Sequence, residues 1–285
     1  MANLLKGKDV SLAIIDDCKK RAESLKANGI NPTLAIIRVG ENDGDISYEK
    51  GARKRCDEIG IEVKGVVFPE DVDKETFYNA LNNLNNDDNV HGILMLRPLP
   101  KHLDNELART SINPYKDIDG CSDASLAGIF TAKKHGFAPC TAEAAIAILD
   151  YYGIDVEGKN VTIIGRSLVI GKPVSMLLLN RNATVTICHS KTKNLSDITK
   201  NADILICATG QMESISKDFV SDNQTIIDVG VSWNESKGKL CGDVLFEEVE
   251  PIVKDITPVP GGVGAVTSSI LCRHVIEAAE SQYNK

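Results

Sequence analysis

A strand, a tight turn and the start of a helix are predicted by Val161-Thr162-Ile163-Ile164-Gly165-Arg166-Ser167-Leu168-Val169-Ile170-Gly171-Lys172-Pro173. An apolar β-branched run ends at Gly165, and an amphipathic segment extends from Pro173 to Asn180. The N-terminus of such a helix exposes unpaired N–H groups and favours phosphate. The spacing Gly-x-Ser-x-x-x-Gly is one residue longer than the usual dinucleotide fingerprint, so alone it is equally consistent with a plain turn.

Three further apolar runs of strand length follow this stretch, at residues 183–188, 202–210 and 225–230. Strands that alternate with helical segments indicate βαβ units and a parallel sheet. Cofactors of such sheets bind at the carboxyl ends of the strands, where Gly165, Thr209-Gly210 and Gly230 fall. We therefore expect a Rossmann-type dinucleotide site at this edge.

The end of the second strand, residues 188–192, indicates which dinucleotide binds, because it contains no acid. An NAD site usually places Asp or Glu about 20 residues beyond the glycine turn. Ser190 and Lys191 can instead donate hydrogen bonds to a 2′-phosphate, with Arg166 in the neighbouring turn, whereas a carboxylate would repel it. This pattern favours NADP over NAD, although Lys191 is also compatible with a solvated loop position.

Composition excludes several classes of protein. The 285 residues are 42% hydrophobic and 25% charged, with a net charge of −8 and no basic run, which argues against nucleic-acid and membrane partners. No apolar stretch approaches the ~20 residues of a membrane span, and the start lacks a secretory signal. The eight cysteines lack Cys-x-x-Cys spacing, and the five histidines show no metal-ligand spacing. We expect a cytoplasmic protein with reduced thiols and no metal.

The first hundred residues indicate a second, smaller α/β unit. The expected order is helix 9–27, strand 33–39, helix 47–59, strand 62–68, helix 74–84 and strand 91–96. The stretch 136–141 contains Gly and Pro and is expected to join two domains, residues 1–140 and 141–266. Thr141 is expected to cap a helix that reaches Tyr152.

Four short segments carry candidate chemistry, each with a simpler structural reading. Tyr48 falls near the start of a helix whose basic residues can be a solvated face, and Pro98-Leu99-Pro100 can wall a planar ligand or merely end a strand. Residues 116–120 place two acids before a glycine, as surface turns do, yet one carboxylate could bind a pterin-like donor edge. The uncharged loop 257–264, with two prolines and three glycines, suits backbone contact with a flat ring.

Together these segments resemble the bifunctional 5,10-methylenetetrahydrofolate dehydrogenase/5,10-methenyltetrahydrofolate cyclohydrolase family, known as FolD. The resemblance covers essentially the whole chain. The motifs that carry it are Val39-Gly40 with Ser47-Tyr48, Gly92-Ile93-Leu94 to Pro98-Leu99-Pro100, Lys116-Asp117-Ile118-Asp119-Gly120, Pro139-Cys140-Thr141, Gly165-Arg166-Ser167 with Val169 to Pro173, Cys188-His189-Ser190, and Thr257-Pro258-Val259-Pro260-Gly261-Gly262-Val263-Gly264.

The resemblance implies an N-terminal catalytic domain and a Rossmann-type NADP-binding domain with a folate cleft between them. It also implies a C-terminal helix, 267–285, that packs on the first domain, and a homodimer. Tyr48 and Asp119 match the catalytic residues: Tyr48 stacks near the pterin ring, and Asp119 bonds the amino and ring nitrogens of the pterin. The other substrate-binding positions that the resemblance implies are Leu96, Pro98, Gly262 and Val263. The cofactor-binding positions that it implies are Gly165, Arg166, Ser167, Gly171, His189, Ser190, Thr209, Gly210, Val231 and Thr267.

Three positions depart from the family pattern. Ala52 stands four residues after Tyr48, where the family has its catalytic lysine, and Leu96 stands where the family has a glutamine. Ala265 replaces the usual proline after Gly264. The expected activity is therefore oxidation of 5,10-methylenetetrahydrofolate by NADP with little or no cyclohydrolase activity, the hydrolysis falling to a separate cyclohydrolase of the same pathway.

Three other interpretations stay open from the sequence. One is a fully bifunctional dehydrogenase/cyclohydrolase, and another is a folate- or NADP-binding protein without turnover. The third is a different dehydrogenase on a similar two-domain fold, such as a shikimate-type enzyme, against which the loop 257–264 and the motif at Asp119 argue.

Overall fold

The computed structural model describes residues 1–283, which form two compact units. The six-stranded unit comprises Met1–Leu12 and Thr141–Thr267, and the three-stranded unit comprises Ala13–Cys140 and residues 268–283. Each unit is a parallel α/β sheet, so the expected two-domain α/β class is confirmed.

The smaller sheet has the strand order β3-β2-β4, with all neighbours parallel. Its strands are β2 (Thr33–Val39), β3 (Glu62–Phe68) and β4 (Gly92–Met95). The helices of this unit are α2 (Asp43–Ile59), α3 (Lys74–Asn86), α4 (Asn105–Thr110), α5 (Asp123–Phe130), most of α1 (Gly7–Ala27) and nearly all of α10 (Thr267–Tyr283). Strands β2 and β3 have the predicted bounds.

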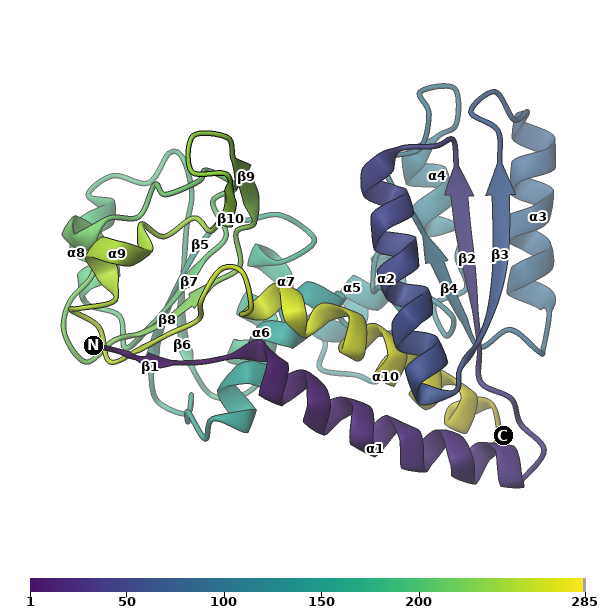
Figure 1. The fold of residues 1–285 in the computed structure, drawn as a ribbon, viewed down its shortest axis with the longest axis horizontal. Coiled ribbons are helices and arrows are strands. Elements are labelled where there is room, and N and C mark those ends of the chain that lie inside the picture. The colour runs from purple at the N-terminus through teal and green to yellow at the C-terminus, as the bar shows by residue number, and fades with distance from the viewer. Residues whose placement is uncertain (284–285) are drawn as a thin grey trace. The chain divides into compact units, whose positions relative to one another are not determined.

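The two faces of this sheet are covered by different helices. Ile37 and Met95 point to one face, where Phe77 and Leu81 of α3 complete a buried core. Helix α10 packs closely on the opposite face, because a Cβ at Gly92 would lie 3.1 Å from the Val275 side chain of that helix. Figure 1 shows α2 and α3 on either side of β2 and β3. The expected packing of the C-terminal helix in this unit is confirmed for residues 268–283, and the last two residues of the expected helix lie outside the described residues.

Helix α2 begins four residues earlier than predicted. Asn42 is its N-cap, because the Asn42 side chain accepts hydrogen bonds from the backbone N–H groups of Gly44 and Asp45. The helix ends at Gly60, whose φ of 88° is the left-handed conformation that glycine adopts readily. Tyr48 therefore lies in the second turn of α2 rather than the first.

The larger sheet has six parallel strands in the order β1-β11-β8-β7-β5-β6. These are β1 (Asn3–Leu4), β11 (Asp255–Ile256), β8 (Thr225–Asp228), β7 (Ile204–Cys207), β5 (Asn160–Ile164) and β6 (Thr184–Cys188). The helices of this unit are α6 (Cys140–Tyr151, from Thr141 on), α7 (Gly171–Leu179), α8 (Leu195–Lys200) and α9 (Phe246–Val249), with short 3₁₀ turns at Lys217–Phe219 and Val263–Ala265. A hairpin of β9 (Ser232–Asn234) and β10 (Lys239–Cys241) follows β8 (Figure 1).

Some predictions for this unit are wrong. Helix α6 begins at Cys140, so Thr141 is a helical residue and not the cap. The two-residue strands β1 and β11 and the hairpin were not predicted.

All eight cysteines are free thiols, as expected, and seven of them are buried. None of the helices from residue 1 to residue 283 is long and apolar enough to cross a membrane.

Candidate functional site

The turn after β5 is built for close backbone approach. Gly165 has a φ of +131°, and a Cβ there would collide with the carbonyl oxygen of Ala208. A Cβ at Gly171 would collide in turn with the carbonyl oxygen of Gly165. Helix α7 starts at Gly171 without a side-chain cap. The Lys172 N–H donates to the Ser167 carbonyl at 3.1 Å and Pro173 has no N–H, so the helix start offers an anion the Gly171 N–H.

Polar side chains follow the ends of two adjacent strands, β5 and β6. Arg166 and Ser167 follow β5 and are exposed, and Ser190 follows the neighbouring strand β6 and is also exposed. The preceding residue, His189, is engaged in its own turn: its N–H donates to Thr192 Oγ1 at 2.9 Å, and its Nδ1 accepts from the Lys191 N–H at 3.1 Å. The donors at Arg166, Ser167 and Ser190 therefore fit a phosphate group.

The next turn along the sheet edge is held by an aspartate that sequence reasoning missed. The Asp243 carboxylate accepts the backbone N–H groups of Thr209 and Gly210 at 2.5 and 3.1 Å. Asp243 is only 1% exposed, and its other oxygen has no hydrogen-bond partner among the described residues. The signal for it in the sequence is weak, since Asp243 follows a short hairpin that shows no clear period.

A second missed aspartate, Asp228, holds the turn after β8. Its carboxylate accepts N–H groups from Gly230, Asp243 and Val244. Burial raises the pKa of Asp228 to about 7, against the lowering effect of these backbone bonds. The sequence did offer a signal here, because Asp228 is the one acid inside the apolar run 225–230.

The loop after β11 lines a cavity of about 330 Å³ together with Asp228, Val231 and Leu240. Val231 is half exposed, whereas Gly262 and Val263 are buried. The loop is fastened to the start of α1, because the Gly7 N–H donates to the Gly261 carbonyl at 2.8 Å. Thr267, at the start of α10, donates its hydroxyl to the Gly264 carbonyl at 3.2 Å.

In the three-stranded unit the structure brings Tyr48 and Asp119 together. The Tyr48 side chain is 41% exposed, yet the surrounding protein and the negative charge of Asp119 raise the pKa of its hydroxyl above the usual range. Burial and the charge of Asp117 raise the pKa of Asp119 to about 6, while the Arg97 guanidinium lowers it. The two residues that the resemblance singled out thus share one environment.

The two acids of the 116–120 motif have separate roles. Asp117 is fully buried and accepts hydrogen bonds from the N–H groups of Cys121 and Ser122 and from the Ser125 hydroxyl. It therefore holds its own turn together, whereas Asp119, two residues on, remains partly exposed and available to a ligand.

Contacts with His274 and Phe137 hold the turn that carries Asp119. His274 of α10 lies 2.7 Å from the Ile118 carbonyl oxygen through Nδ1, and Phe137 stacks on the His274 ring at a centroid distance of 4.8 Å. Gly120 has a φ of +62°, and a Cβ there would collide with the backbone at Ala138. The Asp119 carboxyl is therefore presented by a turn with little freedom to move.

Arg97 is a further residue that sequence reasoning missed. It directly follows Leu96 at the end of β4 and is half buried. Within residues 1–283 its guanidinium forms neither a hydrogen bond nor an ion pair, but its charge lowers the pKa of Asp119. No local pattern predicts this effect, because Arg97 and Asp119 are far apart in the chain.

Apolar side chains occupy positions 52 and 96, which depart from the family pattern. Ala52 is 2% exposed and lies one turn after Tyr48 on α2, and Leu96 is 7% exposed. Pro98, which follows, is exposed. Neither Ala52 nor Leu96 offers a side-chain donor, acceptor or titratable group to a ligand.

The basic residues of α2 point elsewhere, as the simpler reading of this helix suggested. Lys50 and Lys54 are exposed, and Arg53 is tied to Glu49 by a hydrogen bond of 2.8 Å. Among the described side chains, no group of three or more His, Cys, Asp or Glu residues could hold a metal ion.

Comparisons with known proteins match both units. Residues 5–119 match the catalytic domain of the tetrahydrofolate dehydrogenase/cyclohydrolase family, and residues 139–283 match its NAD(P)-binding domain. The chain is 47% identical over 281 residues to a bifunctional protein FolD of Carboxydothermus hydrogenoformans, with 98% of each chain covered. It is 48% identical to the bifunctional protein FolD of Clostridioides difficile, with 99% of this chain and 98% of that one covered.

Solved structures agree over the full length. The bifunctional enzyme FolD, methylenetetrahydrofolate dehydrogenase/cyclohydrolase, from Campylobacter jejuni has a TM-score of 0.95 at 40% identity, with 99% of each chain covered. The FolD of Trypanosoma brucei, complexed with NADP cofactor and inhibitor, has a TM-score of 0.92 at 31% identity, covering 100% of this chain and 99% of that one. With both domains matched and identities near one half, the chain belongs to the tetrahydrofolate dehydrogenase/cyclohydrolase family.

Proposed function

We propose that this protein oxidises 5,10-methylenetetrahydrofolate to 5,10-methenyltetrahydrofolate with NADP and has little or no cyclohydrolase activity. The observation that carries the proposal is the pair of buried apolar residues, Ala52 and Leu96, beside an otherwise complete site at Tyr48 and Asp119. The relatives described as bifunctional, and the one solved with NADP, support the reaction class and the cofactor.

The oxidation moves one hydride from the one-carbon bridge of the folate to the nicotinamide and leaves a methenyl cation and NADPH. The ring nitrogens of the substrate stabilise this cation, so the protein supplies orientation rather than acid–base chemistry. Tyr48 would stack near the pterin ring. Asp119 would bond the amino and ring nitrogens of the pterin, and its pKa of about 6 leaves the carboxylate ionised at neutral pH.

The residues at the carboxyl edge of the six-stranded sheet fit NADP. The colliding Cβ positions at Gly165 and Gly171 show that backbone, not side chain, faces this turn. We assign Arg166, Ser167 and Ser190 to the 2′-phosphate, because all three are exposed donors beside an uncapped helix start. With NADP bound at this edge of the sheet, its nicotinamide ring would accept the hydride. The loop at Gly262 and Val263 would lie beside that ring.

The hydrolytic half requires groups that this chain lacks. Adding water to the methenyl cation and opening a C–N bond needs proton transfers, a contribution of typically ~10²–10⁴-fold. The resemblance places a lysine and a glutamine for this task at positions 52 and 96. Ala52 follows Tyr48 by about 400° of helix rotation and so shares its face, whereas Lys50 and Lys54 lie about 200° and 240° away.

The test is a measurement of both rates on one purified preparation. Reduction of NADP by methylenetetrahydrofolate reports the dehydrogenase, and the decay of methenyltetrahydrofolate absorbance against buffer alone reports the cyclohydrolase. We expect the first and no enzyme-dependent acceleration of the second. A clear acceleration would assign the bifunctional activity, and binding of folate and NADP without reduction would assign a non-catalytic role.

We also propose that the protein is a homodimer and that a separate cyclohydrolase consumes its product. Sedimentation of the purified protein tests the first statement. The second follows from the chemistry, since a methenyl cation released without hydrolysis must be opened elsewhere to yield 10-formyltetrahydrofolate.

A further inference from the structure

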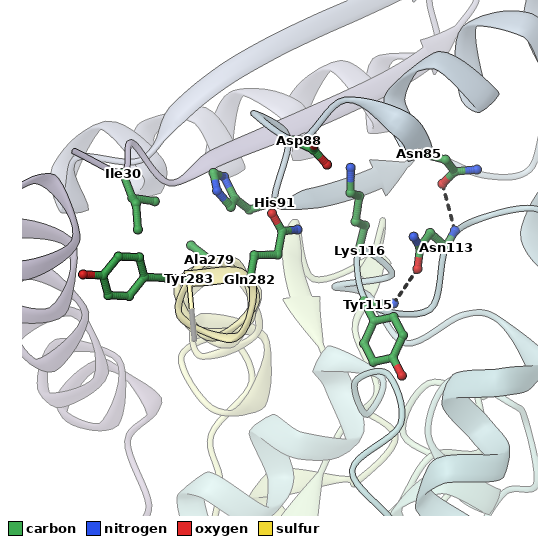
Figure 2. Close-up of a pocket in the computed structure, with 10 residues that line it drawn as sticks. All are labelled: Ile30, Asn85, Asp88, His91, Asn113, Tyr115, Lys116, Ala279, Gln282 and Tyr283. Atoms are coloured by element: carbon green, nitrogen blue, oxygen red, sulfur yellow. Dashed lines mark hydrogen bonds between the residues drawn. The ribbon is translucent and has the colours of Figure 1, made fainter. Parts of the chain in front are cut away.

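A cavity of about 600 Å³ opens in the three-stranded unit at the amino end of β4 (Figure 2). His91 precedes β4, whereas Leu96 of the candidate substrate site follows it, five residues further along. At about 3.3 Å per residue the two positions are roughly 16 Å apart, so this cavity is separate from the site of Tyr48 and Asp119. Its volume lies within the range of small-molecule sites, about 300–1,000 Å³.

His91 presents an unused donor to the cavity. The His91 side chain is only 5% exposed, and its Nδ1 accepts the backbone N–H of Thr33 at 3.1 Å. Nδ1 is therefore unprotonated, and the proton of the neutral ring sits on Nε2. Burial and the Lys116 charge lower the pKa of His91, which keeps the ring neutral. Among the described residues no acceptor meets Nε2, so this N–H is free for a ligand.

Lys116 places a positive charge in the same hollow. Its side chain is 4% exposed, and its Nζ donates to the carbonyl oxygens of Leu84 at 3.1 Å and Asp87 at 2.7 Å. Two of the three ammonium protons thus close the end of α3, and the third is left for another acceptor. Figure 2 shows Lys116 and His91 extending into one space, with the Asp88 carboxylate beside Lys116.

One part of the remaining wall suits a flat apolar group. Ile30 and Ala279 are apolar, and the rings of Tyr115 and Tyr283 also line the cavity, whereas the amides of Asn85, Asn113 and Gln282 make the rest of the wall polar. Tyr115 is held edge-on against His135 at a centroid distance of 5.7 Å. The exposed Asp88 adds a negative charge that would repel a dianion such as phosphate but attract an ammonium group.

We propose that this cavity binds an α-amino acid with an aromatic side chain. The ligand carboxylate accepts hydrogen bonds from His91 Nε2 and Lys116 Nζ, its ammonium group faces Asp88, and its ring packs on Ile30 and Tyr283. The proposal does not depend on the proposed oxidation, because the cavity shares no residue with the Tyr48 and Asp119 site.

Calorimetric titration of the full chain tests the proposal with three probes of nearly one shape. L-Phenylalanine carries both charges, phenylacetate only the carboxylate, and phenethylamine only the ammonium group. We expect L-phenylalanine to bind most tightly, phenylacetate more weakly, and phenethylamine not at all. Saturation by inorganic phosphate at lower concentration than L-phenylalanine would overturn the assignment.

Two variants separate the contacts. His91→Asn keeps an oxygen that can accept the Thr33 N–H but removes the Nε2 donor, and should weaken L-phenylalanine binding about 10- to 150-fold. Asp88→Asn should remove the preference for L-phenylalanine over phenylacetate. Asp71→Asn, another exposed acid outside the cavity, is the control and should bind all three probes as the parent does.

Dehydrogenase rates of the same variants show that they are folded and should stay unchanged. No saturable binding of L-phenylalanine to the parent protein at about 10 mM would overturn the proposal, since it would leave less than about 3 kcal/mol of binding. Equal affinity of the parent and His91→Asn would overturn it as well. If the parent protein binds L-phenylalanine but does not reduce NADP with methylenetetrahydrofolate, that result would count against the proposed function alone.

Discussion

Replacing Asp119 by asparagine should stabilise the protein at neutral pH while it damages the candidate site. The ordinary pKa of the carboxyl is 3.8, and in the folded protein it is about 6. Below pH 4 the group is protonated in both the folded and the unfolded chain. Above pH 6 it is ionised in both, and the folded state then holds a carboxylate whose charge it disfavours.

The magnitude follows from the two pKa values. Each tenfold difference in proton affinity is worth about 1.36 kcal/mol, so the step from 3.8 to about 6 lowers the free energy of unfolding by up to about 3 kcal/mol at pH 7.5. This loss develops as the pH rises from about 4 to 6. Asparagine carries no charge at any pH, so Asp119→Asn should gain about 1–3 kcal/mol at pH 7.5 and only about 0.5 kcal/mol at pH 4.

Urea unfolding at pH 4 and pH 7.5 measures the difference directly. Asp117→Asn is the contrasting variant, because that carboxylate accepts four hydrogen bonds, one of them from the Cys121 thiol, and its loss should destabilise the fold. The exposed Asp71→Asn is the control, with no expected change. A destabilised Asp119→Asn at pH 7.5, or an equal gain at both pH values, would refute the argument from burial.

The same variant should lose activity. A carboxylate that accepts hydrogen bonds from the pterin contributes about 1.5–3 kcal/mol, so kcat/KM for methylenetetrahydrofolate should fall roughly 10- to 150-fold. The parent enzyme should show an acid limb in kcat/KM with an apparent pKa near 6, which Asp119→Asn should abolish.

Three further outcomes are expected. Because the Arg97 charge lowers the pKa of Asp119, Arg97→Leu should move the acid limb of the kcat/KM profile upward by up to about one pH unit, whereas Arg97→Lys should leave it in place; unchanged profiles for both would exclude the effect. Arg166→Ala should raise KM for NADP by about 10- to 150-fold with little change for NAD, and equal changes would refute the 2′-phosphate assignment. The double variant Ala52→Lys with Leu96→Gln should gain cyclohydrolase activity that neither single variant shows, as followed by methenyltetrahydrofolate decay, and no gain would place the defect elsewhere.

Regular apolar patterns made much of the fold predictable. Strands β2 and β3 were predicted with their observed bounds because their runs of apolar and β-branched residues end at clear turns. Strands β1 and β11 have two residues each, too few to show a period, and they pair over some 250 residues of chain, with Asn3 opposite Asp255. No local sequence pattern predicts the pairing of β1 with β11.

The candidate site was predictable where a residue acts through its place in a motif. Tyr48 and Asp119 followed from motifs, and the structure supplies their shared environment. Arg97 and Asp243 could not be predicted, because each acts through a charge or a hydrogen bond on a residue distant in sequence. The free Nε2 of His91 likewise depends on the Thr33 N–H, which only the folded sheet brings to it.

The pairing of β1 with β11 has a consequence for how the chain is made. The six-stranded unit needs residues from both its first dozen and a segment ending near position 267, and the three-stranded unit needs the helix that begins there. During synthesis the first strand must therefore wait for a partner made some 250 residues later, at 5–20 residues per second. The six-stranded unit cannot close on the ribosome before the segment that ends near position 267 has emerged, and the three-stranded unit cannot close before the final helix has emerged. An unpaired sheet edge and an uncovered apolar face therefore persist through most of translation. Newly made chains would present these two surfaces to a chaperone.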